Sequence, residues 1–514
     1  MQQTPFRFLS FKEYVPDCLR FWIYILFLIA FQFSNGMYFT AMSQMEGELS
    51  ITMNDVKMMS HAMLIGLTMY FPLAFRLKFR FTNRTCLLIA SLGLAACNLA
   101  VPFIHSRLLL MAICFVAGFL RLFGTFECLS SILPKIAPTH NYAVFLSFVF
   151  FIVLGVIHIF DIASTYIIYY YNWKYVHYAA VLLLQLVALA AFFLMRPFRF
   201  MPKLPLYGVD WLGMALWSIF ILSLIFVAQY GEQLDWLHSP YIRVATGTAF
   251  IALAFNIGRM AHIRHPFLEL TAFRTRNLTN LLLLFLLMGI LLSTKNMLQN
   301  IFTGGVLHFD RLNTASLKWF EFFGMFIGAV FSWFALTRLK WAHKSLTFLG
   351  MTAIIIYIAA MYFLAVTYIN IEKLYLPLVF CGFGQICIFI ALTVYAQATA
   401  PFKNYFQVLG ILGLIRTGLA SPVGDAIYTY AMKGLLSKHI AAIGSTIDPH
   451  IFLPPFNTAP IETAALIATL RELFGWSVLL GILVLIAIAA SRFKRGVKKP
   501  IPSLQGLYRV IIRH

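Results

Sequence analysis

Several ionisable side chains stand inside long apolar stretches of this sequence, where a charge without a partner is costly. Glu127, His158 and Asp161 form the first group, and the spacing of His158 and Asp161 puts both on one face of a helix. A carboxyl group in a cavity of low dielectric constant can bind a proton from one side of a membrane and release it to the other. We therefore interpret Asp161 and Glu127 as candidates for proton coupling.

The same residue types also have a purely structural use, because oppositely charged side chains on neighbouring helices can pair. Arg121, His158, Arg416 and Asp425 are candidates for such pairing, or for gating a passage between helices. Arg416 and Asp425 belong to a stretch, 410–425, that is rich in glycine and contains one proline. Small residues let helices approach closely, so this stretch indicates either a moving interface or tight packing.

The composition indicates that these side chains lie within a membrane. The chain has 514 residues, of which 61% are hydrophobic and only 11% are charged, whereas a soluble chain carries roughly 25% charged residues. Lipid must therefore cover most of the surface. The net charge is +21, but the basic residues crowd short segments between apolar runs, as the positive-inside rule describes. We expect anionic lipid headgroups as their partners, and no nucleic acid.

The chemistry of an enzyme is not apparent in the remaining residues. The seven cysteines fall in or beside apolar runs and form no CxxC pair, so they indicate neither a disulfide framework nor a zinc site. No GxxxxGK loop occurs, which argues against ATP as a direct energy source. The acids outside the apolar runs are scattered and make no DxD or HxxxxD set. We therefore expect no catalytic residues, no cofactor and no metal ion.

Fourteen apolar runs are long enough, or nearly so, to cross the roughly 30 Å of membrane hydrocarbon as helices. The chain is thus predicted to be an all-α, polytopic membrane protein. Between the last two spans we expect a long loop, from about 433 to 462, that contains Asp448 and His450. The predicted spans are residues 21–42, 58–75, 86–104, 108–132, 143–168, 175–195, 211–230, 242–260, 278–300, 315–337, 346–369, 374–397, 406–432 and 468–491.

The distribution of Lys and Arg predicts the orientation. With the N-terminus inside and an even number of spans, most basic residues fall in segments on the inside. We therefore predict that both termini are cytoplasmic. The first apolar run is longer than the core of a signal peptide, so we interpret it as an uncleaved span.

Five segments carry a resemblance to a known family. The loop after the second span follows the pattern G-x-L-x-x-R-x-G-x-R at Leu77, Arg80 and Arg84, while Phe75 and Thr82 replace its glycines. The other four segments are residues 171–177, 210–236, 265–277 and 414–416. On these residues the chain resembles the fourteen-span drug:proton antiporters of the major facilitator superfamily, of the EmrB/QacA type, with degenerate motifs.

The resemblance implies two bundles of six helices with two extra helices between them, divided here at 1–200, 201–276 and 277–514. It implies alternating access around a site at the midplane, with Leu77, Arg80 and Arg84 in a cytoplasmic loop latch. The implied location is the bacterial inner membrane. The implied partners are an amphipathic small-molecule substrate and, for some members, a periplasmic adaptor and an outer-membrane channel.

The predicted function is secondary active transport, in the form of proton-coupled efflux of amphipathic small molecules. One departure from the family keeps alternatives open. The family's span-five motif G-P-x-x-G-G falls on residues 160–165, where its glycines are gone and Asp161 stands in place of the proline. The first alternative is a transporter of another substrate or direction on the same fold, for uptake or for lipid. A membrane-bound transferase is the second.

Overall fold

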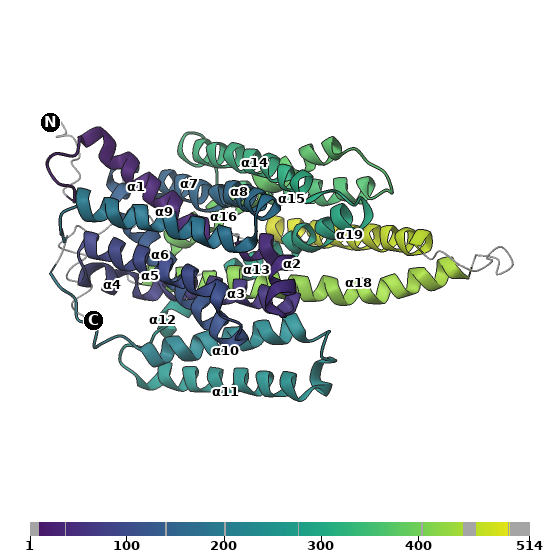
Figure 1. Cartoon of the computed structure of the whole chain (residues 1–514), viewed down its shortest axis with the longest axis horizontal. Coiled ribbons are helices and arrows are strands. Elements are labelled where there is room, and N and C mark those ends of the chain that lie inside the picture. The colour runs from purple at the N-terminus through teal and green to yellow at the C-terminus, as the bar shows by residue number, and fades with distance from the viewer. Residues whose placement is uncertain are drawn as a thin grey trace.

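The computed structural model describes residues 10–35, 37–138, 141–199, 202–275, 277–401, 404–445, 459–491 and 493. Within these ranges the chain is built almost entirely of helices (Figure 1). Thirteen helical stretches are long and apolar enough to cross a membrane. The first stretch of helix adds another crossing, because α1 (Asp17–Gln32) and α2 (Met37–Leu49) follow each other after a short 3-10 turn. The prediction of an all-α membrane protein with about fourteen spans is confirmed.

The first half of the chain packs around α6. This helix contacts α1, α3 and α5, while α9 packs against α5 and α8. Its helices after α2 are α3 (Met53–Met69), α4 (Ala74–Arg80), α5 (Asn83–Ala100), α6 (Arg107–Ile136), α7 (Tyr142–Phe150), α8 (Val156–Tyr170) and α9 (Trp173–Leu194).

The helices of the C-terminal part of the chain pack around α16, which contacts α14 and α15, while α19 packs against α15 and α18. Its helices are α12 (Leu270–Phe273), α13 (Leu278–Ser293), α14 (Arg311–Thr337), α15 (His343–Leu364), α16 (Tyr375–Thr399), α17 (Tyr405–Gly413), α18 (Ala420–Gly444) and α19 (Ala459–Ala490). Between the two groups, α10 (Trp211–Tyr230) and α11 (Pro240–His262) lie beside the rest, as Figure 1 shows. We propose from this packing the division into 1–200, 201–276 and 277–514.

Each helix group contains a close contact between two helix backbones that a glycine allows. In the first group, a methyl group added to Gly118 of α6 would overlap the carbonyl oxygen of Met63 on α3. In the second, a methyl group on Gly382 of α16 would overlap the carbonyl oxygen of Glu321 on α14. Glycine is needed at both places because only its missing side chain lets the two backbones touch. The repetition supports an internal pseudo-symmetry of the two groups.

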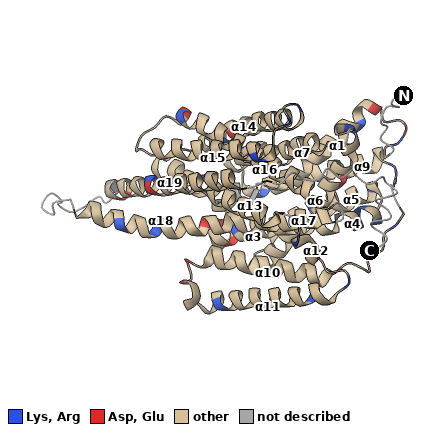
Figure 2. Cartoon of the chain, turned by 180° about the vertical axis from the view of Figure 1, so that it is seen from behind, with Lys and Arg blue, Asp and Glu red and all other residues tan. Residues whose placement is uncertain are grey.

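Short polar side chains begin many of these helices. Thr52 accepts a hydrogen bond from the backbone of Asp55 at the start of α3, and the Asp55 side chain bonds back to Thr52, which completes a capping box. The side chains of Asn172 and Asp310 each accept one backbone hydrogen bond, from Lys174 at the start of α9 and from Leu312 at the start of α14. Such caps satisfy the first backbone N–H groups of a helix. Figure 2 shows uncharged helices over most of the length of the bundle.

One predicted boundary is wrong. The loop expected from about 433 begins later, because α18 continues to Gly444, and helix resumes at Ala459. Residues 433–444 are rich in Leu, Ala and Lys, which favour helix even where the sequence is no longer apolar. As a result α18 and α19 form a hairpin that extends past the other helices in Figure 1. We call this the hairpin end and the opposite end, where α4 lies, the α4 end. Asp448 and His450 lie outside the described residues.

Candidate functional site

A cluster of charged side chains joins the two helix groups. The Nζ atom of Lys318 on α14 lies 2.7 Å from Oδ2 of Asp161 on α8. Nε2 of His158 lies 3.5 Å from Oε1 of Glu321, and Lys295 donates a hydrogen bond to the same oxygen. His158, Asp161 and Glu321 are buried. We call these five residues the interface cluster.

Irregular helical turns position the interface cluster. A π-helical turn, η4 (Phe151–Gly155), leads directly into α8 and its two members, and a second, η6 (Thr294–Gln299), carries Lys295. Such turns occur often at functional sites, because the extra residue turns side chains to a new direction. Lys318 and Glu321 are one turn apart on α14 and therefore face the same neighbour. Among the described residues, Oδ1 of Asp161 and Nδ1 of His158 are buried without a hydrogen bond.

Glu127 lies in a separate pair within the first helix group. Nζ of Lys78, from α4, lies 3.2 Å from Oε2 of Glu127 and also donates to Ser130. The hydroxyl of Ser131 lies 3.4 Å from the other carboxylate oxygen. Both charged side chains are almost fully buried. The structure therefore places the two proton-coupling candidates apart: Asp161 lies between the helix groups, and Glu127 anchors α4 to α6.

Arg121 contacts the end of α1. Its Nε donates to the backbone oxygen of Phe31 at 3.2 Å, and Nη2 donates to Oε1 of Gln32 at 2.5 Å. Gln32 in turn donates to the hydroxyl of Thr125 at 3.0 Å. This network joins α6 to the end of α1, where α1 gives way to the 3-10 turn.

Arg416 and Asp425 are not brought together. Arg416 lies in the π-helical turn η10 (Leu414–Leu419), and Asp425 follows on α18 more than two turns later. Asp425 lies beside Ser293 and Ser421 and in the field of Lys57 from α3. No ion pair within 4 Å involves either side chain in the part of the chain that the structure describes.

The structure gives these surroundings for the residues of the predicted loop latch. Leu77 is buried, Arg80 is exposed, and Arg84 places its guanidinium carbon 4.3 Å from the ring centroid of Phe192 in its own helix group. At this α4 end the two groups meet through Phe75 and Phe406, whose ring centroids are 4.5 Å apart.

The two helix groups are in contact at both ends. At the α4 end they meet through Phe75 and Phe406, and midway along the span that contains α3 the hydroxyls of Thr68 and Thr417 are 3.1 Å apart. Toward the hairpin end, Nη2 of Arg311 donates to the hydroxyl of Ser43 at 2.5 Å, and the interface cluster lies deeper along the same helices. Contacts between the two helix groups are therefore present toward both ends of the bundle.

A cavity of about 1000 Å³ opens at the hairpin end between α13, α18, α19 and the segment after α10. Trp236, Tyr430 and Trp476 line it together with aliphatic side chains. Its charged groups are Asp235 and the ion pair of Glu232 with Lys433, at 2.6 Å. Its size and largely apolar lining suit a drug-sized amphipathic molecule. Within the described ranges, no group of His, Cys, Asp and Glu is arranged to hold a metal ion.

Sequence reasoning did not single out Lys318 or Lys78. Lys318 and Lys78 lie near helix ends, where Lys is ordinary, and their long side chains reach inward from there. The spacing of Lys318 and Glu321 was a usable signal, because it places a cation and an anion on one face.

Comparison with known proteins identifies the family of this fold. Residues 24–424 match the model of the Major Facilitator Superfamily. Among curated proteins, the chain is 24% identical over 277 residues to multidrug export protein EmrB of Escherichia coli, covering 52% of this chain and 51% of the relative. It is 20% identical over 242 residues to colistin resistance protein EmrB of Acinetobacter baumannii, covering 47% and 46%. The chain thus spans about half the length of the curated relatives it matches.

Solved structures agree on the fold. A peptide transporter of the POT family in complex with alafosfalin has a TM-score of 0.57 at 14% identity, covering 94% of this chain and 96% of that one. The nucleoside transporter NupG has a TM-score of 0.54 at 11% identity, covering 91% and 99%. At such low identity the likeness concerns the fold alone. The family comprises transporters rather than enzymes, and with the match over most of its length the chain belongs to the major facilitator superfamily.

Proposed function

We propose that this protein exports amphipathic small molecules in exchange for protons, by alternating access of its two helix groups. The observation that carries the proposal is the interface cluster, in which Asp161 and His158 of α8 face Lys318 and Glu321 of α14 across the boundary between the groups. A buried charge pair is weakened strongly when one partner is neutralised. Protonation of such a pair therefore bears directly on whether the two groups stay together.

The coupling step follows from the Asp161–Lys318 pair. Protonating Asp161 removes its attraction for Lys318, whose side chain is 37% exposed and is then no longer held at the interface. Loss of this attraction destabilises the closed state by the interaction energy of the pair. The state in which the two groups are apart at this end therefore becomes more populated. Deprotonation toward the other side restores the pair and closes this end again. One proton thus biases one conformational change.

Substrate export is supported by two further observations. The cavity at the hairpin end is aromatic and largely apolar, with a few charged groups of both signs in its lining. The curated relatives are named for multidrug export and for colistin resistance. Because both come from bacteria with an inner membrane, we also propose that membrane as the location. A periplasmic adaptor and an outer-membrane channel belong to the same proposal.

Replacing Asp161 with Asn is expected to abolish transport driven by a pH gradient. Movement of substrate down its own concentration gradient should continue. The amide keeps the size of the side chain but cannot change its charge, so a proton no longer alters the interface. The measurement is accumulation of cationic, neutral and anionic amphipathic dyes in proteoliposomes with an imposed pH gradient.

Asp17→Asn provides the matched control, because Asp17 is an exposed acid paired with Arg20 on α1. Glu127→Gln tests the second candidate, and we expect it to weaken the anchoring of α4 with less effect on coupling. Undiminished gradient-driven transport in Asp161→Asn would contradict the proposed coupling. Transport only in the opposite direction would instead establish uptake on the same fold.

A further inference from the structure

The strongest unassigned feature of the interior is a guanidinium surrounded by aromatic rings. The Arg416 guanidinium carbon lies 4.7 Å from the ring centroid of Phe389, 5.8 Å from that of Phe150 and 5.9 Å from that of Phe285. The rings also touch each other, with centroid separations of 5.9 Å for Phe150 with Phe389 and for Phe285 with Phe389. We call these four residues the arginine cage.

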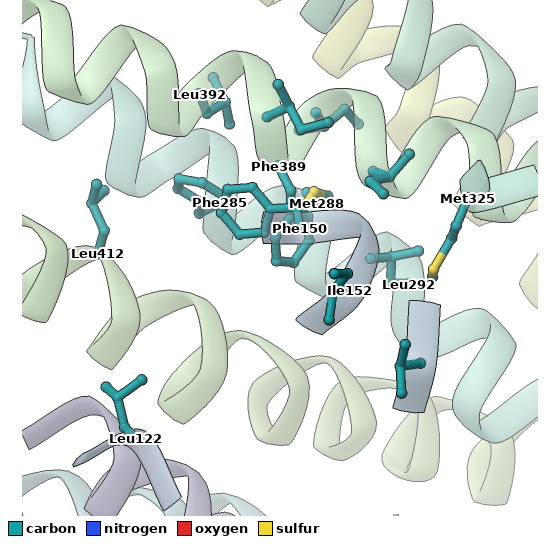
Figure 3. Close-up of a cluster of buried hydrophobic side chains, with 14 of the residues drawn as sticks. Leu122, Phe150, Ile152, Phe285, Met288, Leu292, Met325, Phe389, Leu392 and Leu412 are labelled. Atoms are coloured by element: carbon teal, nitrogen blue, oxygen red, sulfur yellow. The ribbon is translucent and has the colours of Figure 1, made fainter. Parts of the chain in front are cut away.

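The arginine cage is built from both helix groups. Phe150 ends α7 in the first group, whereas Phe285 and Phe389 come from α13 and α16 in the second. Figure 3 shows these three rings gathered with Met288, with Leu412 on a facing helix. All three rings are buried, yet Arg416 keeps partial exposure. The protein therefore does not fully enclose the guanidinium.

The charge of Arg416 is not neutralised by the protein. Nε of Arg416 is buried without a hydrogen bond, and across the described ranges no carboxylate forms an ion pair with the side chain. Asp425 on the same helix is about 13 Å further along the axis at 1.5 Å per residue. Contacts with ring faces recover only part of what a guanidinium loses when it leaves water. A cation held in this way lacks an anion.

We propose that the arginine cage binds the acidic group of an anionic, aromatic amphipath, so that this protein's substrates include organic carboxylates or sulfonates. The planar guanidinium presents parallel N–H donors that match two oxygens of such a group. The phenylalanine rings offer offset or edge contacts to the aromatic part of the same molecule. This inference rests on the proposed export function, for which it names a class of substrate.

The location also suits a transported molecule. Because the cage takes one ring from the first helix group and two from the second, a bound anion contacts both groups, and their relative movement changes its surroundings. Phe150 and His158 lie on the same continuous stretch, α7, η4 and α8, which links the arginine cage to the interface cluster.

The test compares three pyrene probes that differ in charge. Purified full-length protein in phosphatidylcholine nanodiscs is titrated with pyrenesulfonate, with the neutral pyrene sulfonamide and with a pyrenyl trimethylammonium ion, and binding is followed by fluorescence anisotropy. We expect the sulfonate to bind roughly tenfold to a hundredfold more tightly than the sulfonamide, as a charge-assisted bidentate contact allows. In Arg416→Gln this preference should disappear, and in Arg416→Lys it should fall.

Arg243→Gln is the matched control, because Arg243 is an exposed residue of α11 outside the cage and its replacement removes the same charge. The preference should be unchanged in this variant. Thermal melting supplies a second measurement: saturating sulfonate should raise the melting temperature of the native protein but not of Arg416→Gln. Adding phosphatidylglycerol to the nanodiscs separates the two sources of an anion, since a lipid headgroup in the cage would compete with the sulfonate.

Equal binding of sulfonate and sulfonamide to the native protein, or tighter binding of the cation, would overturn the inference. Competition by phosphatidylglycerol, with no selective binding in its absence, would assign the cage to lipid and overturn it as well. These outcomes do not depend on the export proposal. That proposal is contradicted instead if a pH gradient drives no transport of dye. Selective sulfonate binding without gradient-driven transport would support the arginine cage as an anion-binding site and contradict proton-coupled export.

Discussion

Replacing Glu321 with Ala is expected to destabilise the folded protein by about 3–5 kcal/mol and to abolish transport, because a buried charge network loses its central anion. Glu321 accepts a hydrogen bond from Lys295, whose side chain is only 16% exposed, and it faces the buried His158 at 3.5 Å. Without the carboxylate, Lys295 keeps a charge in surroundings that solvate it poorly. Thermal melting of the purified protein in detergent measures the loss.

A double variant distinguishes the missing anion from a missing side chain. Lys295→Met with Glu321→Leu removes both charges and fills the space, and such exchanges of buried pairs are often neutral in stability. We expect this variant to melt near the native temperature and still to transport nothing. Glu48→Ala is the control, since the Glu48–Lys174 pair is partly exposed at both members and contributes at most about 1 kcal/mol. A Glu321→Ala protein as stable as Glu48→Ala would show that the interface cluster is not an ion network.

Replacing Gly118 with Val is expected to prevent folding almost completely. A side chain at this position meets the backbone of Met63, which cannot turn aside as a flexible side chain can. Overpacking of a core costs roughly 1–3 kcal/mol where side chains can yield, and more where backbone must move. Because α6 also contacts α1 and α5, displacing it disturbs the whole first helix group. The yield of monodisperse protein by size-exclusion chromatography reports the result.

Gly247→Val is the matched control for that substitution. Gly247 lies in the middle of α11, and a methyl group added there has nothing within 4 Å. The same change of residue should therefore leave the yield close to native. If Gly118→Val were recovered in native amounts, the close approach of α3 and α6 would have to be wrong.

Most of the fold could be predicted from the sequence because a lipid environment imposes a simple requirement on the residues that cross it. A span needs an unbroken apolar run, so runs such as those that became α13 and α19 are visible without any tertiary information. The extension of α18 to Gly444 was missed for the same reason: the apolar requirement ends where the helix leaves hydrocarbon, but helical hydrogen bonding does not. Hydropathy therefore predicts where the spans lie and underestimates how long the helices are.

The candidate site was predictable in its positions but not in its partners. Asp161 and His158 were found because ionisable residues in apolar runs are rare, and the structure places both in the interface cluster. Which helix faces them depends on how the two groups dock, and periodicity carries no information about that. Lys318 remained hidden because its charge is unremarkable at a helix end. The opposite happened with Arg416, for which a pairing interpretation was available but the structure supplies aromatic rings.

The π-helical turn at Leu414–Leu419 has a consequence for how relatives of this protein can diverge. A π turn contains one more residue than the α turn it replaces. Deleting a single residue there would rotate all of α18 by about 100° relative to α17. Tyr428, whose hydroxyl lies 2.8 Å from that of Ser477, would then leave its partner, and the side chains facing the interior would be replaced by a different set. Insertions and deletions of one residue, rather than substitutions, are thus a short evolutionary route to a new lining, and a gap misplaced by one position in an alignment would conceal it.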